Sequence, residues 1–253
     1  MIKDTSAMAD NRSSTCLSWS SFGITDVGKV RKHNEDSLLD KPEIGLWVVA
    51  DGMGGHEGGD IASQMIVKSL GKIHEGITLD RYIDDIEDRL IKVNKRLITK
   101  ARESERNVTM GSTVVGMLAY DRFCTFFWAG DSRLYRLRNR SLRQLSRDHS
   151  QVEIYVEQGL ISRKEAATHP HSNMRTRAIG ADKDLYIDFD IQEMQSGDRY
   201  MLCSDGLTKH LEDIEFEEML SEGSAEEACK ELTALTLERG AGDNVTTIVV
   251  DIE

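Results

Sequence analysis

Leu46-Trp-Val-Val-Ala-Asp-Gly-Met-Gly-Gly55 joins a continuous apolar run to an Asp-Gly pair and further glycines. An apolar run of this length, bounded by turn residues, predicts a strand that is buried on both faces. The Asp-Gly pair marks the end of that strand, and the glycines let the backbone approach its neighbours closely. The stretch therefore predicts one carboxylate, that of Asp51, at the end of a buried strand.

Acids with small neighbours recur near the ends of other apolar runs. The further segments are Arg31-Lys-His-Asn-Glu-Asp36, Ala129-Gly-Asp-Ser-Arg133, Ser204-Asp-Gly206 and Gly242-Asp-Asn244. Each segment alone is a turn signal, because Asp, Gly and Asn are common turn residues. Repeated at several strand ends, they indicate carboxylates that converge on a hard cation. Oxygen ligands favour magnesium or manganese, whereas zinc usually recruits Cys or His.

The glycines after Asp51 do not form a nucleotide-binding loop. They lack the Gly-x-Gly-x-x-Gly spacing, and no Gly-Lys-Ser/Thr opens the following helix. Asp51 is instead placed to bridge two cations through its two oxygens, with the Gly52 carbonyl as a further ligand. From this segment alone, an Asp-Gly turn without metal is an equally good interpretation.

The order of apolar patterns predicts an α+β fold. We expect helical stripes at 61–73 and 83–101, and strands at 19–25, 44–50, 112–119, 123–129, 133–138, 142–145, 185–191, 200–203 and 245–251. Capping boxes at Ser162 and Ser224 predict two later helices. Because strands and helices do not alternate regularly, we expect antiparallel sheets with helices packed on the outside.

Length and composition fit one globular domain over 17–253. The chain has 253 residues, of which 39% are hydrophobic, enough for a sizeable core, and it contains no Pro- or Ser-rich linker. Residues 1–16 are polar and predict a disordered tail. Residues 147–182 combine short helical patterns with a polar stretch, which predicts a mobile insert over the sheet, here called the flap.

Charge and cysteine usage exclude several classes of protein. A net charge of −12 repels nucleic acid and anionic membranes. No apolar run reaches the ~18 residues of a membrane span, and the N-terminus lacks the apolar core of a secretory signal. The four cysteines stand too far apart in sequence for a zinc or redox pair. We expect a cytoplasmic monomer that binds neither nucleic acid nor membranes.

Arg31 is a candidate anion-binding residue, because a guanidinium grips phosphate oxygens in bidentate fashion. If its segment is helical, a surface ion pair with Glu35 is the alternative. If the segment is a strand, Glu35 shares a face with Arg31 and Asp36 faces away. The two acids would then play different roles.

These motifs resemble the metal-dependent type 2C Ser/Thr protein phosphatases in their compact bacterial form. The resemblance runs from about residue 20 to the end and rests on an ordered series: Arg31…Asn34-Glu-Asp36, Asp51-Gly-Met-Gly-Gly-His56, Gly111-Ser-Thr113, Ala129-Gly-Asp-Ser-Arg133, Ser146-x-Asp148-His149, Ser204-Asp-Gly-Leu207 and Asp243-Asn-Val-Thr246. It implies a four-layer α/β/β/α sandwich, in which two antiparallel sheets are flanked by helix pairs. It also implies a binuclear manganese or magnesium centre at one end.

The resemblance assigns a role to each acid. Asp51 would bridge the two ions, and Asp205 and Asp243 would hold one of them. The Gly52 carbonyl would hold the other ion. Asp131 matches the family's position for a third, weaker ion.

Further roles follow from the same resemblance. Arg31 would bind the substrate phosphate, and Glu35 or Asp36 would reach the second ion directly or through water. In some eukaryotic members a His follows the Asp-Gly pair and is proposed as the general acid, whereas this chain has Met53 there. The nearest histidine, His56, is our candidate for the acid, with a surface position as the alternative.

The implied reaction is hydrolysis of phosphoserine and phosphothreonine in proteins. A water or hydroxide shared by two ions about 3.5–4 Å apart would attack phosphorus directly, without a phosphoenzyme. The implied partners are phosphorylated proteins, including Ser/Thr kinases and their substrates in a bacterial cell.

Three other functions fit less well. A phosphatase with an aspartyl nucleophile needs Asp-x-Asp, and Asp51-Gly-Met53 lacks the second acid. A silent domain that only binds phosphoproteins should have lost ligands, and none is missing. A calcium module needs a twelve-residue loop that ends in Glu, which does not appear.

Overall fold

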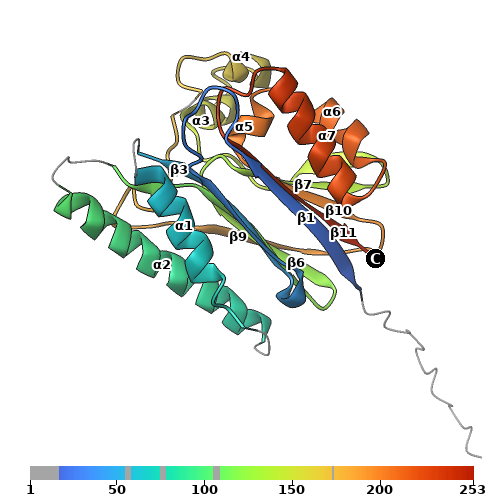
Figure 1. Cartoon of the computed structure of the whole chain (residues 1–253), viewed down its shortest axis with the longest axis horizontal. Helices are drawn as coiled ribbons and strands as arrows, with labels where there is room; N and C mark the ends of the chain where they lie inside the picture. Colours follow the sequence, from blue (N-terminus) through green and yellow to red (C-terminus); the bar gives the residue numbers. More distant parts are fainter. Residues whose placement is uncertain (1–16, 55–57, 75–77, 105–108, 173) are drawn as a thin grey trace, which may run out of the picture.

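The computed structural model describes residues 17–54, 58–74, 78–104, 109–172 and 174–253. Over these residues the chain forms four layers, with two antiparallel sheets packed face to face between two layers of helices (Figure 1). This confirms the predicted α+β sandwich. The predicted tail 1–16 and the candidate acid His56 lie outside the described residues.

The first sheet has the strand order β1-β11-β10-β7-β8. Its strands are β1 (Trp19–Asp26), β7 (Arg133–Arg138), β8 (Ser141–Gln144), β10 (Arg199–Cys203) and β11 (Val245–Ile252). The first and last strands of the chain are therefore neighbours, and they pair Thr25 with Thr246. This pairing brings segments from opposite ends of the sequence to the same end of the sandwich.

The second sheet has the order β2-β3-β5-β6-β9, with β4 beside β3. Its strands are β2 (Asp36–Lys41), β3 (Leu46–Met53), β4 (Gly111–Ser112), β5 (Val114–Tyr120), β6 (Phe123–Ala129) and β9 (Asp188–Glu193). Every residue from Leu46 to Ala50 is fully buried. This confirms the prediction of a strand buried on both faces, since one face packs on the first sheet and the other on helices.

Helix pairs cover the outer faces of both sheets (Figure 1). Helices α1 (Gly58–Leu70) and α2 (Leu79–Glu103) lie over the second sheet, and α6 (Asp213–Leu220) and α7 (Ala225–Glu238) lie over the first. The apolar stripe of α2 is buried, as its 3.6-residue period predicts; the stripe consists of Ile86, Leu90, Val93 and Leu97. Among the described helices, none combines the length and apolar character needed to cross a bilayer.

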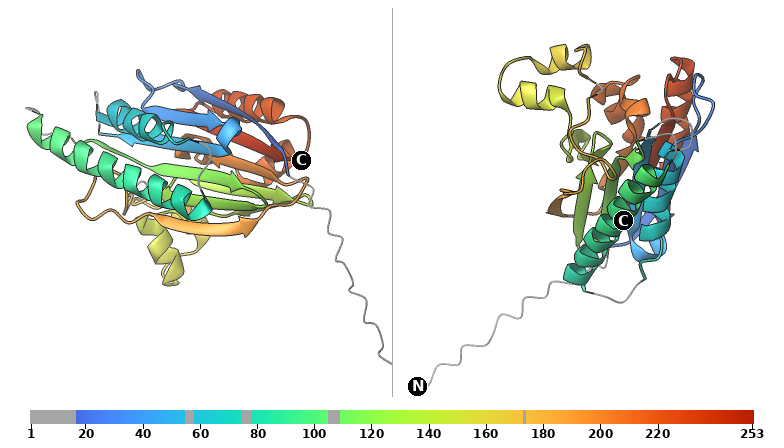
Figure 2. Two further views of the ribbon diagram at one scale, coloured as in Figure 1. Left: turned by 90° about the horizontal axis from the view of Figure 1, so that it is seen from below. Right: turned by 90° about the vertical axis from the view of Figure 1, so that its left-hand side faces the viewer.

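Two short helices project from the sandwich (Figure 2). They are α3 (Gln151–Glu157) and α4 (Arg163–Ala167), and both fall within the predicted flap. Ser162 and Glu165 form the predicted capping box at the start of α4. The predicted box of Ser224 and Glu227 likewise opens α7.

The structure around β3 differs from the prediction in one additional strand and in both boundaries of β3. Strand β2 was not predicted, because its sequence Asp-Ser-Leu-Leu-Asp-Lys alternates poorly and the strand lies half-buried at the sheet edge. Pro42–Ile44 forms a 3₁₀ turn at the start of the predicted strand 44–50, since proline fixes a helical φ. At the other end β3 extends to Met53, because Met53 pairs with Gly111.

Other differences involve short or divided elements. The predicted strand 185–191 begins only at Asp188, because Leu185 and Ile187 pack against the core beneath α1 and α2 instead of joining the sheet. The predicted strand 112–119 is divided between β4 and β5 at Thr113. Helices α5 (Asp205–Thr208) and α6 were not predicted, since they are too short for a periodic signal.

Candidate metal centre

Antiparallel pairing brings two acids together at one end of the second sheet. Asp36 begins β2, and Asp51 stands near the end of β3. The register pairs these two residues directly, because the start of one strand meets the end of its antiparallel neighbour. Both residues are buried, with 7% and 9% exposure.

The first sheet brings three further acids to the same place by the same rule. Asp205 follows β10, Asp131 precedes β7 and Asp243 precedes β11. Strand β10 runs antiparallel to both β7 and β11, so its end meets the starts of its two neighbours. Carboxylate oxygens of Asp51, Asp131 and Asp205 lie within 4.8 Å of one another. Acids from three separate motifs therefore converge, with Asp36 paired to Asp51 and Asp243 linked to Asp205 through Lys209.

The donor set fits a divalent cation of the magnesium or manganese type. The three clustered side chains supply only carboxylate oxygens, and all three are buried. Hard cations prefer such oxygen ligands. Three buried carboxylates this close together repel one another unless positive charge lies between or beside them.

Thr113 fixes the positions of Asp51 and Asp131 relative to each other. The backbone N–H of Asp51 donates to Thr113 Oγ1 at 3.1 Å, and the backbone N–H of Thr113 donates to the Asp51 carbonyl at 2.9 Å. Thr113 Oγ1 also lies 2.6 Å from Ser132 Oγ, next to Asp131. Thr113 of the Gly111-Ser-Thr113 motif therefore has a structural role at the centre.

Gly52 has no room for a side chain. A Cβ built at this position would lie 2.2 Å from the Gly59 carbonyl oxygen and 2.5 Å from the Glu35 carbonyl oxygen. The Gly52 N–H donates to that Glu35 oxygen at 3.1 Å. Glycine is therefore required here for close backbone approach, and it brings the loop before β2 against the end of β3.

Asp36 and Glu35 have different surroundings. Asp36 Oδ2 accepts a hydrogen bond from Thr246 Oγ1 at 2.7 Å, and burial raises the pKa of Asp36 to about 7. Glu35 lies on the preceding loop and is only partly buried, although burial raises its pKa as well. Asp36 is thus an inner neighbour of Asp51, whereas Glu35 lies at the edge.

Burial and mutual repulsion also perturb the other clustered acids. The pKa of Asp51 lies well above its usual value, because of burial and then the charges of Asp205 and Asp36. Burial raises the pKa of Asp131 to about 6, against the opposing effect of Arg175. Added positive charge at this position would lower both values.

Arg31 lies at the open edge of the cluster, in a segment that is neither helix nor strand. Its side chain is 52% exposed and pairs with Asp243, with Nε at 2.9 Å from Oδ1 and Nη2 at 3.0 Å from Oδ2. Its ion-pair partner is thus Asp243, and the alternative of a helical pair with Glu35 was wrong. Although burial opposes the charge on Asp243, Lys209 and Arg31 hold its pKa below the usual value.

The sequence analysis missed two cations at the centre. Lys209 Nζ lies 2.8 Å from Asp205 Oδ2 and 3.4 Å from Asp243 Oδ2. Its spacing of four residues from Asp205 was a detectable signal. Arg175 lies among Asp51, Asp131 and Asp205. No local pattern in the sequence relates it to those acids.

His149 supports the turn that carries Asp131. The Gly130 N–H donates to His149 Nδ1 at 3.2 Å, and the His149 N–H donates to the Gly130 carbonyl at 2.8 Å. Because Nδ1 accepts a hydrogen bond, the ring proton belongs on Nε2, which lies 3.1 Å from Asp188 Oδ2. The histidine of the Ser-x-Asp-His motif thus holds the backbone turn that carries Asp131.

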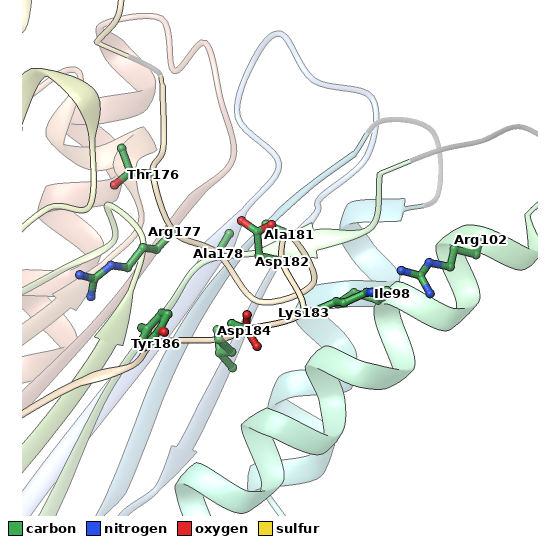
Figure 3. Close-up of a pocket in the computed structure, with 11 residues that line it drawn as sticks. Ile98, Arg102, Thr176, Arg177, Ala178, Ala181, Asp182, Lys183, Asp184 and Tyr186 are labelled. Atoms are coloured by element: carbon green, nitrogen blue, oxygen red, sulfur yellow. The ribbon is translucent and has the colours of Figure 1, made fainter.

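A cavity of about 630 Å³ lies between α2 and the segment 176–186 (Figure 3). It is bounded by Ile98 and Arg102 of α2 and by residues of the segment 176–186. Its charged lining includes Arg177, Lys183, Asp182 and Asp184. The mixed signs of these charges do not favour a ligand of one charge. None of the clustered acids is among the described residues that line it.

Comparison with known proteins places the chain among phosphatases. Residues 29–238 match the family model described as Protein phosphatase 2C. The chain is 36% identical over 236 residues to the serine/threonine phosphatase stp of Listeria monocytogenes, covering 90% of this chain and 93% of the relative. It is 32% identical over 229 residues to the serine/threonine protein phosphatase PstP of Mycobacterium tuberculosis, covering 90% of this chain and 44% of that relative.

Solved structures agree with these sequence matches. PppA, a key regulatory component of T6SS in Pseudomonas aeruginosa, has a TM-score of 0.86 and 41% identity, with 93% of this chain and 98% of that chain covered. The catalytic domain of PstP in complex with two manganese ions has a TM-score of 0.84 and 30% identity, with 93% of this chain and 99% of that chain covered. Both similarities extend over nearly the whole described fold.

Proposed function

The chain belongs to the protein phosphatase 2C family, and we propose that it hydrolyses phosphoserine and phosphothreonine in proteins with the help of divalent metal ions. The observation that carries this proposal is the convergence of Asp51, Asp131 and Asp205 within 4.8 Å. An Asp that only forms a turn does not require two other buried carboxylates nearby. An Asp that binds a metal ion does, because several oxygen ligands must surround the ion.

The ligands for two ions are available at the centre. We propose that Asp51 contacts both ions, that Asp205 and Asp243 hold one, and that the Gly52 carbonyl holds the other. Asp36 or Glu35 completes the second set, directly or through water. When bound, the ions supply an activated water for attack on phosphorus and positive charge for the phosphate oxygens. Manganese is our first choice, because the PstP catalytic domain binds two manganese ions.

Arg31 is well placed to bind the substrate phosphate. Asp243 occupies Nε and Nη2 of its guanidinium. A guanidinium has five N–H donors, so three of them remain for phosphate oxygens. Its exposed position at the edge of the acid cluster suits a group that meets substrate from solution and orients it.

Protonation of the leaving serine or threonine oxygen needs an acid near the centre. His56 remains our candidate from the sequence, and it lies outside the described residues. We also propose that residues 17–253 form one catalytic domain, in which the flap at 147–182 lies beside the substrate.

Phosphorylated proteins, including Ser/Thr kinases and their substrates in a bacterial cytoplasm, are the proposed partners. The net charge of −12 supports the proposal that the protein does not bind nucleic acid or anionic membranes, because like charges repel. We propose that the working form is a monomer, which size-exclusion chromatography with light scattering tests directly.

The direct test measures phosphate release from a phosphothreonine peptide. We expect turnover with MnCl₂, loss of turnover after EDTA, and recovery when Mn²⁺ is restored. Asp205→Asn should remain folded and release at least about 10³-fold less phosphate. Asp190→Asn is the matched control, because Asp190 is an exposed acid on β9 away from the cluster. Peptide binding without hydrolysis under saturating Mn²⁺ would instead indicate a silent phosphoprotein-binding domain.

A further inference from the structure

The loop between β1 and β2 concentrates positive charge in an acidic protein. Residues 27–34, here called the basic loop, contain Lys29, Arg31 and Lys32 and no acid, whereas acids outnumber basic residues by 44 to 32 in the whole chain. Residues 29–33 are all exposed. The proposed reaction uses Arg31 alone, so Lys29 and Lys32 have no role in it.

Asn244 holds the two ends of the basic loop. Its Nδ2 donates to the carbonyl oxygens of Val27 at 2.9 Å and His33 at 3.0 Å, and its Oδ1 accepts from the N–H of Glu35 at 2.8 Å. Asn244 is only 5% exposed, and it directly follows the proposed metal ligand Asp243. One buried amide therefore fixes the loop relative to the centre.

The backbone of the basic loop also packs directly on the segment 241–244. The N–H of Lys29 donates to the Ala241 carbonyl at 3.0 Å. Gly28 has a φ of +75°, and a Cβ at this position would lie 2.2 Å from the Asp243 carbonyl oxygen. Glycine is therefore required for this close approach. A loop held in this way is ordered before a ligand arrives, so binding costs little ordering entropy.

The charges of Lys29 and Lys32 are available to a ligand. Within the described part of the chain, neither side chain has an ion-pair or hydrogen-bond partner, whereas Arg31 pairs with Asp243. The two lysines lie within two residues of Arg31, a backbone distance of at most about 7 Å. Charges act over about 8 Å at physiological ionic strength. Both lysines can therefore act on a group that is bound beside the phosphate.

A short acidic peptide segment suits this surface best. Carboxylates beside the phosphorylated residue would approach the lysines while the phosphate contacts Arg31. A long polyanion such as nucleic acid would extend beyond the basic loop and meet a protein with a net charge of −12. The limited extent of the basic loop thus favours a few acidic side chains in a peptide.

We propose that the basic loop selects phosphoserine and phosphothreonine that are flanked by Asp or Glu. This inference rests on the proposed function and names the class of substrate within it. Lys29 and Lys32 are then specificity-determining residues. They act on substrate binding, so they change KM and leave kcat unaltered.

The test compares kcat/KM with Mn²⁺ for three phosphothreonine peptides of equal length, whose flanking residues are acidic, neutral or basic. We expect the acidic peptide to exceed the neutral one by about fivefold through a lower KM, as two exposed ion pairs allow. The basic peptide should fall below the neutral one. The double variant Lys29→Ala, Lys32→Ala should lose the advantage of the acidic peptide while its turnover of the neutral peptide stays the same. Screening in 0.5 M NaCl should also remove the advantage.

The double variant Lys95→Ala, Lys100→Ala is the matched control. It changes the net charge by the same amount at two exposed positions of α2, and it should keep the preference for the acidic peptide. Equal kcat/KM for the acidic and neutral peptides, or a preference that survives in the basic-loop variant, would overturn the inference. If no peptide is hydrolysed, the proposed function fails by itself. Fluorescence anisotropy of the same peptides with Mn²⁺ then compares their affinities, so the inference is still decided.

Discussion

The acids and the cations of the centre come from two kinds of region. The acids stand at strand ends, where the register of antiparallel pairing fixes their positions; Asp36 and Asp51 are direct neighbours in the sheet. The cations Arg31, Arg175 and Lys209 extend from loops and from a short helix end. A sheet can place short carboxylates accurately, whereas a long basic side chain can reach the same point from many backbones. The acids should therefore determine metal binding, and the cations should adjust substrate affinity.

The largest expected effect is that of removing the bridging acid. Asp51→Asn should lower phosphopeptide turnover by at least about 10³-fold, because it removes a ligand shared by both ions. The metal-free variant should also be more stable at pH 7.5, by about 1–3 kcal/mol, since it removes a charge from a buried, repelling cluster. Activity assays and thermal unfolding in EDTA measure the two effects.

Normal turnover by Asp51→Asn with saturating Mn²⁺ would show that the strand-end acids are not the metal ligands. An unchanged melting temperature in EDTA would show that these carboxylates do not repel one another. Asp190→Asn serves as the control in both assays.

The pH dependence of the metal-free protein should be the next largest effect. The pKa values of Asp36 and Asp131, about 7 and about 6, lie above the ordinary value of 3.8. Between pH 3.8 and about 7, the folded state therefore binds more protons than the unfolded state. The free energy of unfolding in EDTA should rise as the pH falls from 8 to 5. A gain of roughly 2–4 kcal/mol is expected.

Chemical unfolding in EDTA at several pH values measures this gain. Asp36→Asn should flatten the dependence, because it removes the group with the larger shift. A steady loss of stability from pH 8 to 5 would contradict the assignment of a repelling acid cluster.

Substitution of Arg31 tests the role of the cations, and we expect a smaller loss of activity than for Asp51. Arg31→Ala should lower kcat/KM for a phosphopeptide with neutral flanking residues by about 10–100-fold, as expected for loss of a charge-assisted phosphate contact. Manganese affinity should stay within about threefold of the unmodified value. Lys32→Ala is the control, because Lys32 is the adjacent exposed cation. A parallel loss of bound manganese in Arg31→Ala would give Arg31 a structural role instead.

The acids were predictable from sequence because each motif carries its own local signal. An apolar run followed by Asp-Gly predicts both the strand and an acid at or just after its end, Asp51 for β3 and Asp205 for β10. Helices with a clear period or a capping box, such as α2 and α7, were predicted for the same reason. Antiparallel pairing then needs no further information to bring these strand ends together.

The parts of the fold and of the site that were not predicted depend on contacts between distant segments, and no local sequence pattern indicates these contacts. Strand β2 owes its existence to pairing with β3, because its own sequence is weakly apolar. Arg175 reaches the acids only because Met174 and Thr176 bond to the segment that begins at His149. The different surroundings of Glu35 and Asp36 likewise depend on the register, which places Asp36 beside Asp51.

The most direct test of the central claim is a crystal structure with bound manganese, recorded at the manganese absorption edge. We predict two anomalous peaks, with Asp51 in contact with both ions and with Asp205 and Asp243 at one of them. A structure in which manganese binds elsewhere, while these carboxylates contact only protein groups, would contradict the account.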